Sequence, residues 1–90
     1  MAKAVVTVVG KDKPGIIASV AQTLAAHDVN ILDVSQTIMS DIFTMSMLVN
    51  LEQLDETFNG LQDYLNVLGQ QLNVEIHTQR EEIFDAMRRV

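Results

Sequence analysis

Several residue types that carry common protein chemistry are missing or scarce in this sequence. It has no cysteine and no tryptophan, one proline, and aromatic residues make up only 4% of its 90 residues. The lack of cysteine excludes disulfide scaffolds, cysteine-based zinc sites and thiol nucleophiles, and it fits a reducing compartment, so we expect a cytoplasmic protein. RNA-recognition domains stack bases on aromatic residues of their central strands, and the first strand predicted here has none.

Basic residues are also scarce. The chain has six Lys and Arg against twelve Asp and Glu, a formal net charge of -6, and residues 41–79 contain no Lys or Arg at all. Because nucleic-acid binding depends on neutralising phosphates, we expect no nucleic-acid partner. No run approaches the roughly 20 apolar residues of a membrane-spanning helix, so we expect no membrane partner. The apolar N-terminus lacks a cleavage pattern and is interpreted as a strand, not a signal peptide.

Apolar residues recur with strand and helix periods in alternating blocks. The predicted strands are 3–9, 29–39, 42–51 and 72–78, and the predicted helices are 16–27 and 55–70. With right-handed crossovers, this order gives an α+β, ferredoxin-like βαββαβ fold, in which a four-stranded antiparallel sheet carries two helices on one face. We assign residues 1–79 to one domain and residues 80–90 to a short C-terminal helix that extends it.

The patterns also predict where the strands and the C-terminal helix lie. The first strand is apolar on both alternations and should be central, whereas the second has one mixed face and should be an edge. Met45 and Met47 share the apolar face of the third strand and should be core residues. The last helix has an apolar stripe that needs burial, either on the open sheet face or on a second subunit; it consists of Ile83, Phe84, Met87 and Val90.

No set of catalytic residues assembles from the sequence. His27 and His77 are not spaced as a metal pair, and we interpret them as a helix-end residue and a solvated strand residue. The sequence has neither a nucleophile elbow around a serine nor a phosphate-binding P-loop. We therefore predict no enzyme activity, no metal and no cofactor.

The turn after the first strand is the strongest candidate for a small-molecule site. Asp12 can cap the coming helix, Pro14 suits its first turn, and Gly15 allows close approach of a ligand to the backbone. Free N–H groups at a helix start, with two lysines nearby, favour a carboxylate or another small anion. The same pattern is also that of an ordinary helix start. The residues assigned to this candidate site are Gly10, Lys11, Asp12, Lys13, Pro14, Gly15 and Ile16.

Asn30 is the other candidate ligand-binding residue. It opens the second strand, where an asparagine serves equally well as a turn residue. Its amide is both a donor and an acceptor, so it can bind the ammonium or the carboxylate of a free amino acid.

These motifs are similar to those of ACT domains. The strongest parts of the resemblance are D-x-P-G-I at residues 12–16 and N-I-x-D at residues 30–33, within a match over residues 3–79. The sequence resembles the ACT modules of the glycine cleavage system repressor and of formyltetrahydrofolate deformylases, and small stand-alone ACT proteins most of all. The resemblance implies an amino-acid-sensing module that pairs edge to edge through its second strand, with the ligand between the first turn of one copy and the first helix and second strand of the other.

One departure from the family pattern affects the ligand. Serine-sensing ACT domains carry side-chain donors where this chain has Gly10 and Asp12, and the carboxylate of Asp12 repels that of an amino acid. Asp12 can instead meet an ammonium group. We expect a non-catalytic, homodimeric regulator that binds a small amino acid and signals to an unknown protein partner. The alternative is a dimerisation or protein-interaction module without a small-molecule ligand.

Overall fold

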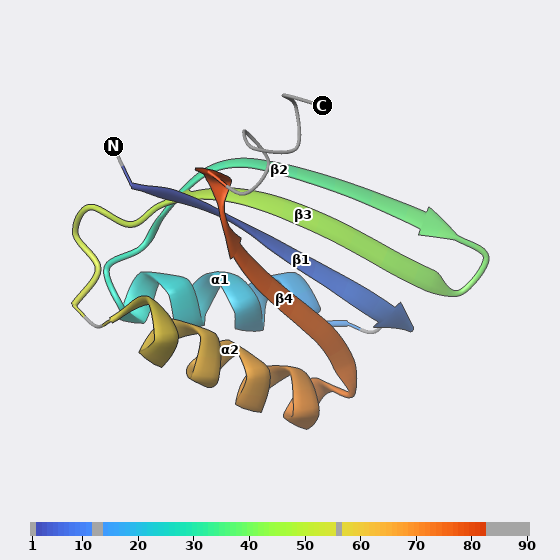
Figure 1. Cartoon of the computed structure of the whole chain (residues 1–90). Helices are drawn as coiled ribbons and strands as arrows, with labels where there is room; N and C mark the ends of the chain where they lie inside the picture. The colour runs from blue at the N-terminus through green and yellow to red at the C-terminus, as the bar shows by residue number, and fades with distance from the viewer. Residues whose placement is uncertain (1, 12–13, 56, 83–90) are drawn as a thin grey trace.

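The computed structural model describes residues 2–11, 14–55 and 57–82 of the chain. Within them, helices and strands follow the predicted order, and all paired strands are antiparallel. Both helices cover one face of the sheet (Figure 1), which confirms the ferredoxin-like βαββαβ fold. The elements are β1 Lys3–Lys11, α1 Ile16–Ala26, β2 Asn30–Met39, β3 Ile42–Asn50, α2 Phe58–Leu72 and β4 Val74–Arg80.

The order of strands in the sheet is β2-β3-β1-β4. β1 is therefore central and β2 is an edge, as predicted. The register also defines two ends of the sheet. Lys3, Asn50 and Asn30 form a row across β1, β3 and β2 at one end, whereas Gly10 and Phe43 lie in a row at the other.

The core lies between the sheet and the two helices. Alternate residues of β1 and β3 point towards the helices, and Met45 and Met47 are buried there as predicted. Each helix buries one stripe against them because its apolar residues recur every three or four positions. The buried side chains of the helices are Ile16, Val20 and Leu24 in α1, and Leu61 and Leu65 in α2.

Both ends of α2 differ from the prediction. The helix begins at Phe58 because Thr57 caps it: the Thr57 hydroxyl accepts a hydrogen bond of 3.0 Å from the Gly60 N–H. It runs past Gly69 to Leu72, and its C-cap, Asn73, has the left-handed backbone conformation typical of a helix end. Gly69 is instead a packing position, since a Cβ there would lie 2.9 Å from the Val74 carbonyl oxygen of β4.

β2 is interrupted, although the sequence pattern predicts unbroken alternation. The register shifts between Ile31 and Asp33, so Leu32 is an extra residue in a β-bulge. Ile31 then packs against the core together with the helix-facing side chains, and Leu32 is exposed. Beyond the bulge every residue of β2 is exposed, because neither helix extends under the outer part of this strand.

Part of the C-terminal prediction falls on residues that the structure does not describe. Ile83, Phe84, Met87 and Val90, the stripe of the predicted C-terminal helix, lie in 83–90 and outside the described residues. Within the described part of the chain, neither helix is long and apolar enough to cross a membrane.

Candidate functional site

The candidate turn leaves the sheet at the C-terminal end of β1. Gly10 pairs with Phe43 on one side and Val74 on the other. A Cβ on Gly10 would lie 2.5 Å from Cγ1 of Val74, so close packing between β1 and β4 explains this glycine. Lys11 is exposed at the end of the strand. Asp12 and Lys13, two of the predicted site residues, lie outside the described residues.

Helix α1 does not begin as the sequence predicts. Its N-cap is Gly15, with φ of 87°, and no side chain of a described residue accepts a hydrogen bond as a cap. The expectation that Asp12 caps the helix falls on a residue outside the described ones, whereas Pro14 precedes the N-cap instead of lying in the first turn. Nothing in the described structure lies within 4 Å of a Cβ built on Gly15, so its positive φ is the reason for a glycine here, and not a crowded neighbour.

The start of α1 offers backbone donors to a ligand. The first hydrogen bond of the helix is donated by Ser19 N–H to the Gly15 carbonyl at 2.9 Å. The N–H groups of Ile16, Ile17 and Ala18 precede that bond, so they have no partner within the helix. Together with the positive end of the helix dipole they favour an anion. Ile16 can contact a ligand only through its backbone, because its side chain is buried in the core.

The structure does not bring Asn30 to this turn within one chain. Asn30 pairs with Asn50, which pairs with Lys3, so it lies at the start of β1, whereas the turn follows the end of β1. The two positions are about seven strand residues apart, or about 23 Å along the sheet. A single small amino acid cannot reach both in one copy of the chain. A site that uses both needs a second copy.

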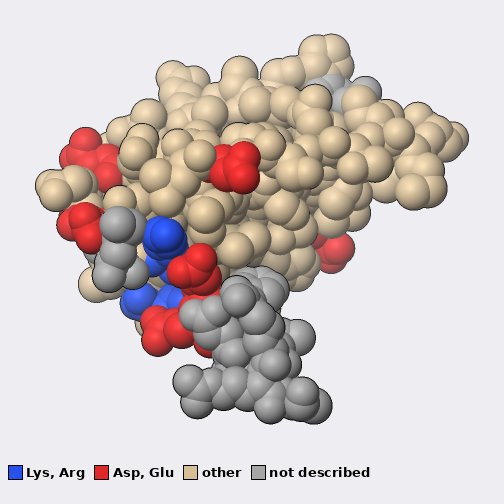
Figure 2. Space-filling view, turned by 90° about the horizontal axis from the view of Figure 1, so that it is seen from above, with Lys and Arg blue, Asp and Glu red and all other residues tan. Residues whose placement is uncertain are grey.

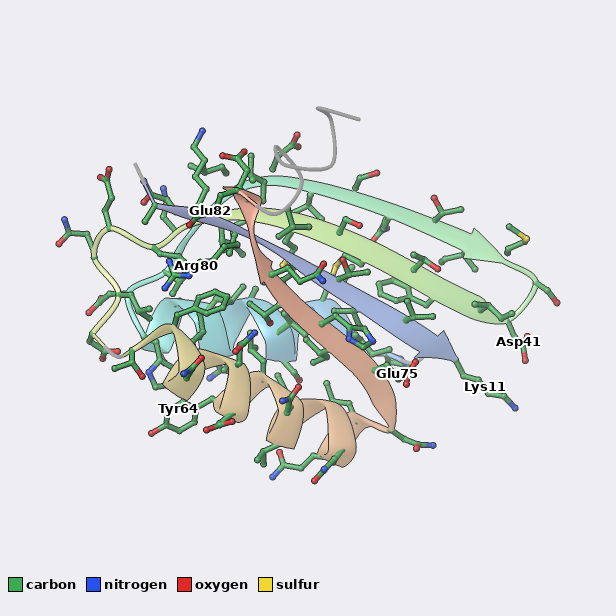
Figure 3. All side chains as sticks on the ribbon, in the orientation of Figure 1. Lys11, Asp41, Tyr64, Glu75, Arg80 and Glu82 are labelled. Carbon is green, nitrogen blue, oxygen red and sulfur yellow. The ribbon has the colours of Figure 1, made fainter. Side chains whose placement is uncertain are left out.

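A hollow beside the end of β1 contains residues that the sequence analysis missed. Its volume is about 540 Å³, and Figure 3 shows two of its lining residues, Lys11 and Glu75, at the same end of the sheet. These two opposite charges form no ion pair with each other in the described structure. An asparagine is common at a helix end, so the sequence could have placed Asn73 there. No sequence pattern indicates that Gln70 or Glu75 lies near Lys11. The hollow is lined by Val9, Gly10, Lys11, Ile42, Gly69, Gln70, Asn73, Val74 and Glu75.

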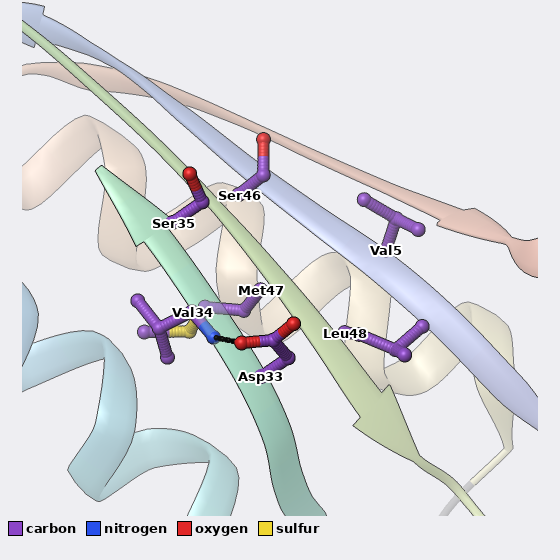
Figure 4. A pocket seen from close by; sticks show the side chains of 7 residues that line it. All are labelled: Val5, Asp33, Val34, Ser35, Ser46, Met47 and Leu48. Atoms are coloured by element: carbon purple, nitrogen blue, oxygen red, sulfur yellow. Dashed lines mark hydrogen bonds between the residues drawn. The ribbon is translucent and has the colours of Figure 1, made fainter. Parts of the chain in front are cut away.

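The sheet face away from the helices is largely uncharged, and Figure 2 shows its few charged groups gathered mainly towards one end. Figure 4 shows a hollow on this face, of about 230 Å³, where the carboxylate of Asp33 accepts a hydrogen bond of 2.9 Å from the Val34 N–H. Sites for small molecules usually have 300 Å³ or more, so this hollow is a weaker candidate than the one beside Lys11.

The two histidines occupy the positions predicted for them. His27 is the C-cap of α1, and His77 is exposed on β4. The described residues include no group of three or more His, Cys, Asp or Glu that could hold a metal ion. His27 does have one contact that the sequence did not predict: its Nδ1 lies 3.2 Å from Oδ1 of Asp55.

Comparison with known proteins gives a consistent result. The family model described as ACT domain matches residues 3–79. A UPF0237 protein of Methanopyrus kandleri is 44% identical over 90 residues and matches over the whole length of both chains. An ACT domain protein from Streptococcus pneumoniae is 42% identical, with a TM-score of 0.82 over 92% of this chain and 93% of that one.

Longer proteins contain the same fold as a part. A glycine cleavage system transcriptional repressor is 28% identical, with a TM-score of 0.75, over 88% of this chain and 45% of its own. A formyltetrahydrofolate deformylase from Pseudomonas syringae, 20% identical with a TM-score of 0.82 over 89% of this chain and 28% of its own, shares the fold. Both protein types are those that the motifs at residues 12–16 and 30–33 resemble.

Proposed function

The chain belongs to the ACT domain family, and from that premise we propose that it is a non-catalytic regulatory module that binds a small amino acid between two copies of itself. The observation that carries the proposal is the separation of the two candidate contacts. The donors at the start of α1 and the amide of Asn30 lie at opposite ends of the sheet. A second copy can supply the missing half.

The free edge of β2 supports such a pairing. A two-fold axis beside β2 sets the start of one β2 next to the end of the other, in an antiparallel arrangement. The end of β2 shares a row with the end of β1: Met39 pairs with Ile42, which pairs with Lys11. Asn30 of a second copy would therefore approach the end of the sheet that carries the α1 start.

Apolar side chains beside that edge also favour a second copy. Val34 and Ile38 lie on the helix-facing side of β2, beyond the cover of α1, and both are exposed. Ile17 on α1 is exposed as well. An edge strand with exposed apolar residues is typical of an interface.

The chemistry of this composite site matches a free amino acid. The N–H groups of Ile16, Ile17 and Ala18 can donate to the carboxylate, and the side-chain oxygen of Asn30 can accept from the ammonium group. These groups bind and orient a ligand but include no nucleophile or general base, which is why we propose a regulatory role and no catalysis.

Thermal-shift titration with the twenty free amino acids tests the proposal, because a ligand of the folded state raises the melting temperature by mass action. At about 100 times Kd the stabilisation should be about 2.7 kcal/mol. We expect Asn30→Ala to abolish the response and Asn66→Ala, an exposed asparagine on α2, to leave it unchanged.

Two outcomes would contradict the proposal. If Lys11→Met removes the response and Asn30→Ala does not, the ligand lies in the hollow beside Glu75 and not between two copies. If no amino acid raises the melting temperature of a folded dimer, the chain is an interaction module without an amino-acid ligand.

A further inference from the structure

The outer surface of the helix layer has an apolar ridge with a hollow on each side. Tyr64 and Val67, three residues apart on α2, are 49% and 53% exposed. One hollow, of about 420 Å³, lies between the helices, and both residues line it together with Ala26 and His27. The other, of about 430 Å³, lies beyond the ridge beside Asp63. We call this surface the helix groove; Figure 3 shows Tyr64 on the side of α2 away from the sheet.

The ridge is held in place by contacts from two other segments. The centroid of the Tyr64 ring lies 4.4 Å from that of the His27 ring, and the two ring planes are inclined by 33° to each other. His27 in turn is bound to Asp55 twice: Nδ1 lies 3.2 Å from Oδ1, and the His27 carbonyl accepts a hydrogen bond of 3.3 Å from the Asp55 N–H. Since Tyr64 is already ordered by these contacts, a partner would lose little further side-chain entropy on binding it.

The described charges on the two helices, at the end of α1 and in the approach to α2 are acidic, whereas Arg80 of β4 lies with its guanidinium carbon 4.4 Å from the Phe58 ring centroid at the start of α2. α1 contains no charged residue, and the single charge of α2 is Asp63. Asp28 and Asp55 add two more acids where α1 ends and the chain leads into α2. A second copy seated on this surface would place acids against acids, which costs free energy. A partner with an apolar stripe and basic residues beside it is complementary.

We propose that the helix groove binds an amphipathic helix of a partner protein, with its apolar stripe over Tyr64 and Val67 and Lys or Arg residues beside Asp55 and Asp63. Helices commonly bind in this way, with side chains at i, i+3, i+4 and i+7 in an apolar groove. Binding of such a helix is argued from the geometry and charge of the helix groove alone. The role of this binding in passing an amino-acid signal to a partner rests on the proposed function.

Intrinsic fluorescence gives a local readout, because Tyr64 is the only tyrosine of the chain and there is no tryptophan. The probes are two synthetic helical peptides of about 18 residues, long enough to form a helix. They share a leucine stripe at i, i+3, i+4 and i+7, and carry either Lys or Glu beside it. We expect the Lys peptide to change Tyr64 fluorescence and to bind at least about tenfold more tightly than the Glu peptide. A tenfold difference in Kd corresponds to about 1.4 kcal/mol of binding free energy.

Two variants add the same charge to the same helix. Val67→Lys changes the ridge and should weaken the Lys peptide about tenfold or more. Asn66→Lys, at an exposed neighbouring position that lines neither hollow, should weaken it much less. Circular dichroism melts show whether both variants remain folded, as expected for exposed positions.

The proposal is wrong if the Lys peptide does not bind at about 1 mM, if both peptides bind equally, or if Asn66→Lys weakens binding as much as Val67→Lys does. Self-association that Val67→Lys abolishes would assign the groove to a second copy instead and would equally overturn it. The amino-acid thermal shift of the unsubstituted chain separates the two proposals: a normal shift without binding of the Lys peptide removes the docking surface alone.

Discussion

Glycine occupies positions 10 and 15 for two different physical reasons. At Gly10 a side chain would collide with Val74 of the neighbouring strand. At Gly15 no described residue would crowd a Cβ, but φ is 87°, which L residues rarely adopt. The sequence therefore predicts the turn correctly from its glycines, whereas the reason for each glycine depends on the neighbouring strand and on the backbone conformation.

Gly15→Ala is expected to lower the free energy of unfolding by about 1 to 2 kcal/mol, because it forces a Cβ into the left-handed region. Gly15→Asn should lose less, since asparagine tolerates this conformation better. Urea unfolding of both variants measures the difference. An alanine variant as stable as the parent would show that the start of α1 does not need a positive φ.

At the scale of elements, the largest differences from the prediction lie where one element meets another. The sequence predicts that α2 ends at residue 70, but the helix continues to Leu72, and Gly69 within it packs closely against β4. β2 was expected to alternate without a break, and it contains a bulge at Leu32. Neither feature has a clear signal in the sequence, because both depend on the register between neighbouring elements.

Gly69→Ala should destabilise the fold, although alanine is the better helix former. A Cβ 2.9 Å from the Val74 carbonyl oxygen forces α2 and β4 apart, and such overpacking costs about 1 to 3 kcal/mol against about 1 kcal/mol gained in helix propensity. Asn66→Ala on the same helix gains propensity without a clash. Thermal unfolding of both should place Gly69→Ala below Asn66→Ala; the reverse order would contradict the close approach of helix and strand.

At the scale of the whole molecule, the proposed function depends on the two candidate ligand contacts lying at opposite ends of the sheet. The motifs at residues 12–16 and 30–33 are close in sequence and belong to the same family pattern. The fold separates Asn30 from the α1 start by the length of β1. It also leaves β2 as an edge with apolar side chains exposed on its helix-facing side.

Ile38→Lys is expected to convert the proposed dimer into a monomer without unfolding it, because Ile38 is 52% exposed on this edge and a lysine disfavours edge pairing. Val67→Lys is a matched control because it adds the same charge at a similarly exposed position on α2, and we expect it to remain a dimer. Sedimentation velocity distinguishes the two states. A dimer that persists in Ile38→Lys would place the interface on another surface.

The sequence by itself determined the order of helices and strands, the central place of β1 and the edge position of β2, because the 2.0 and 3.6 periods of apolar residues are local properties. It also identified the ACT family from short motifs. Only the tertiary structure decided which of the candidate residues meet. The register of the sheet separates Asn30 from the turn and places Lys11 and Glu75 in one hollow, and the packing of α1 beside α2 brings His27, Asp55 and Tyr64 together. Such contacts depend on how elements distant in sequence pack, and no local pattern encodes them.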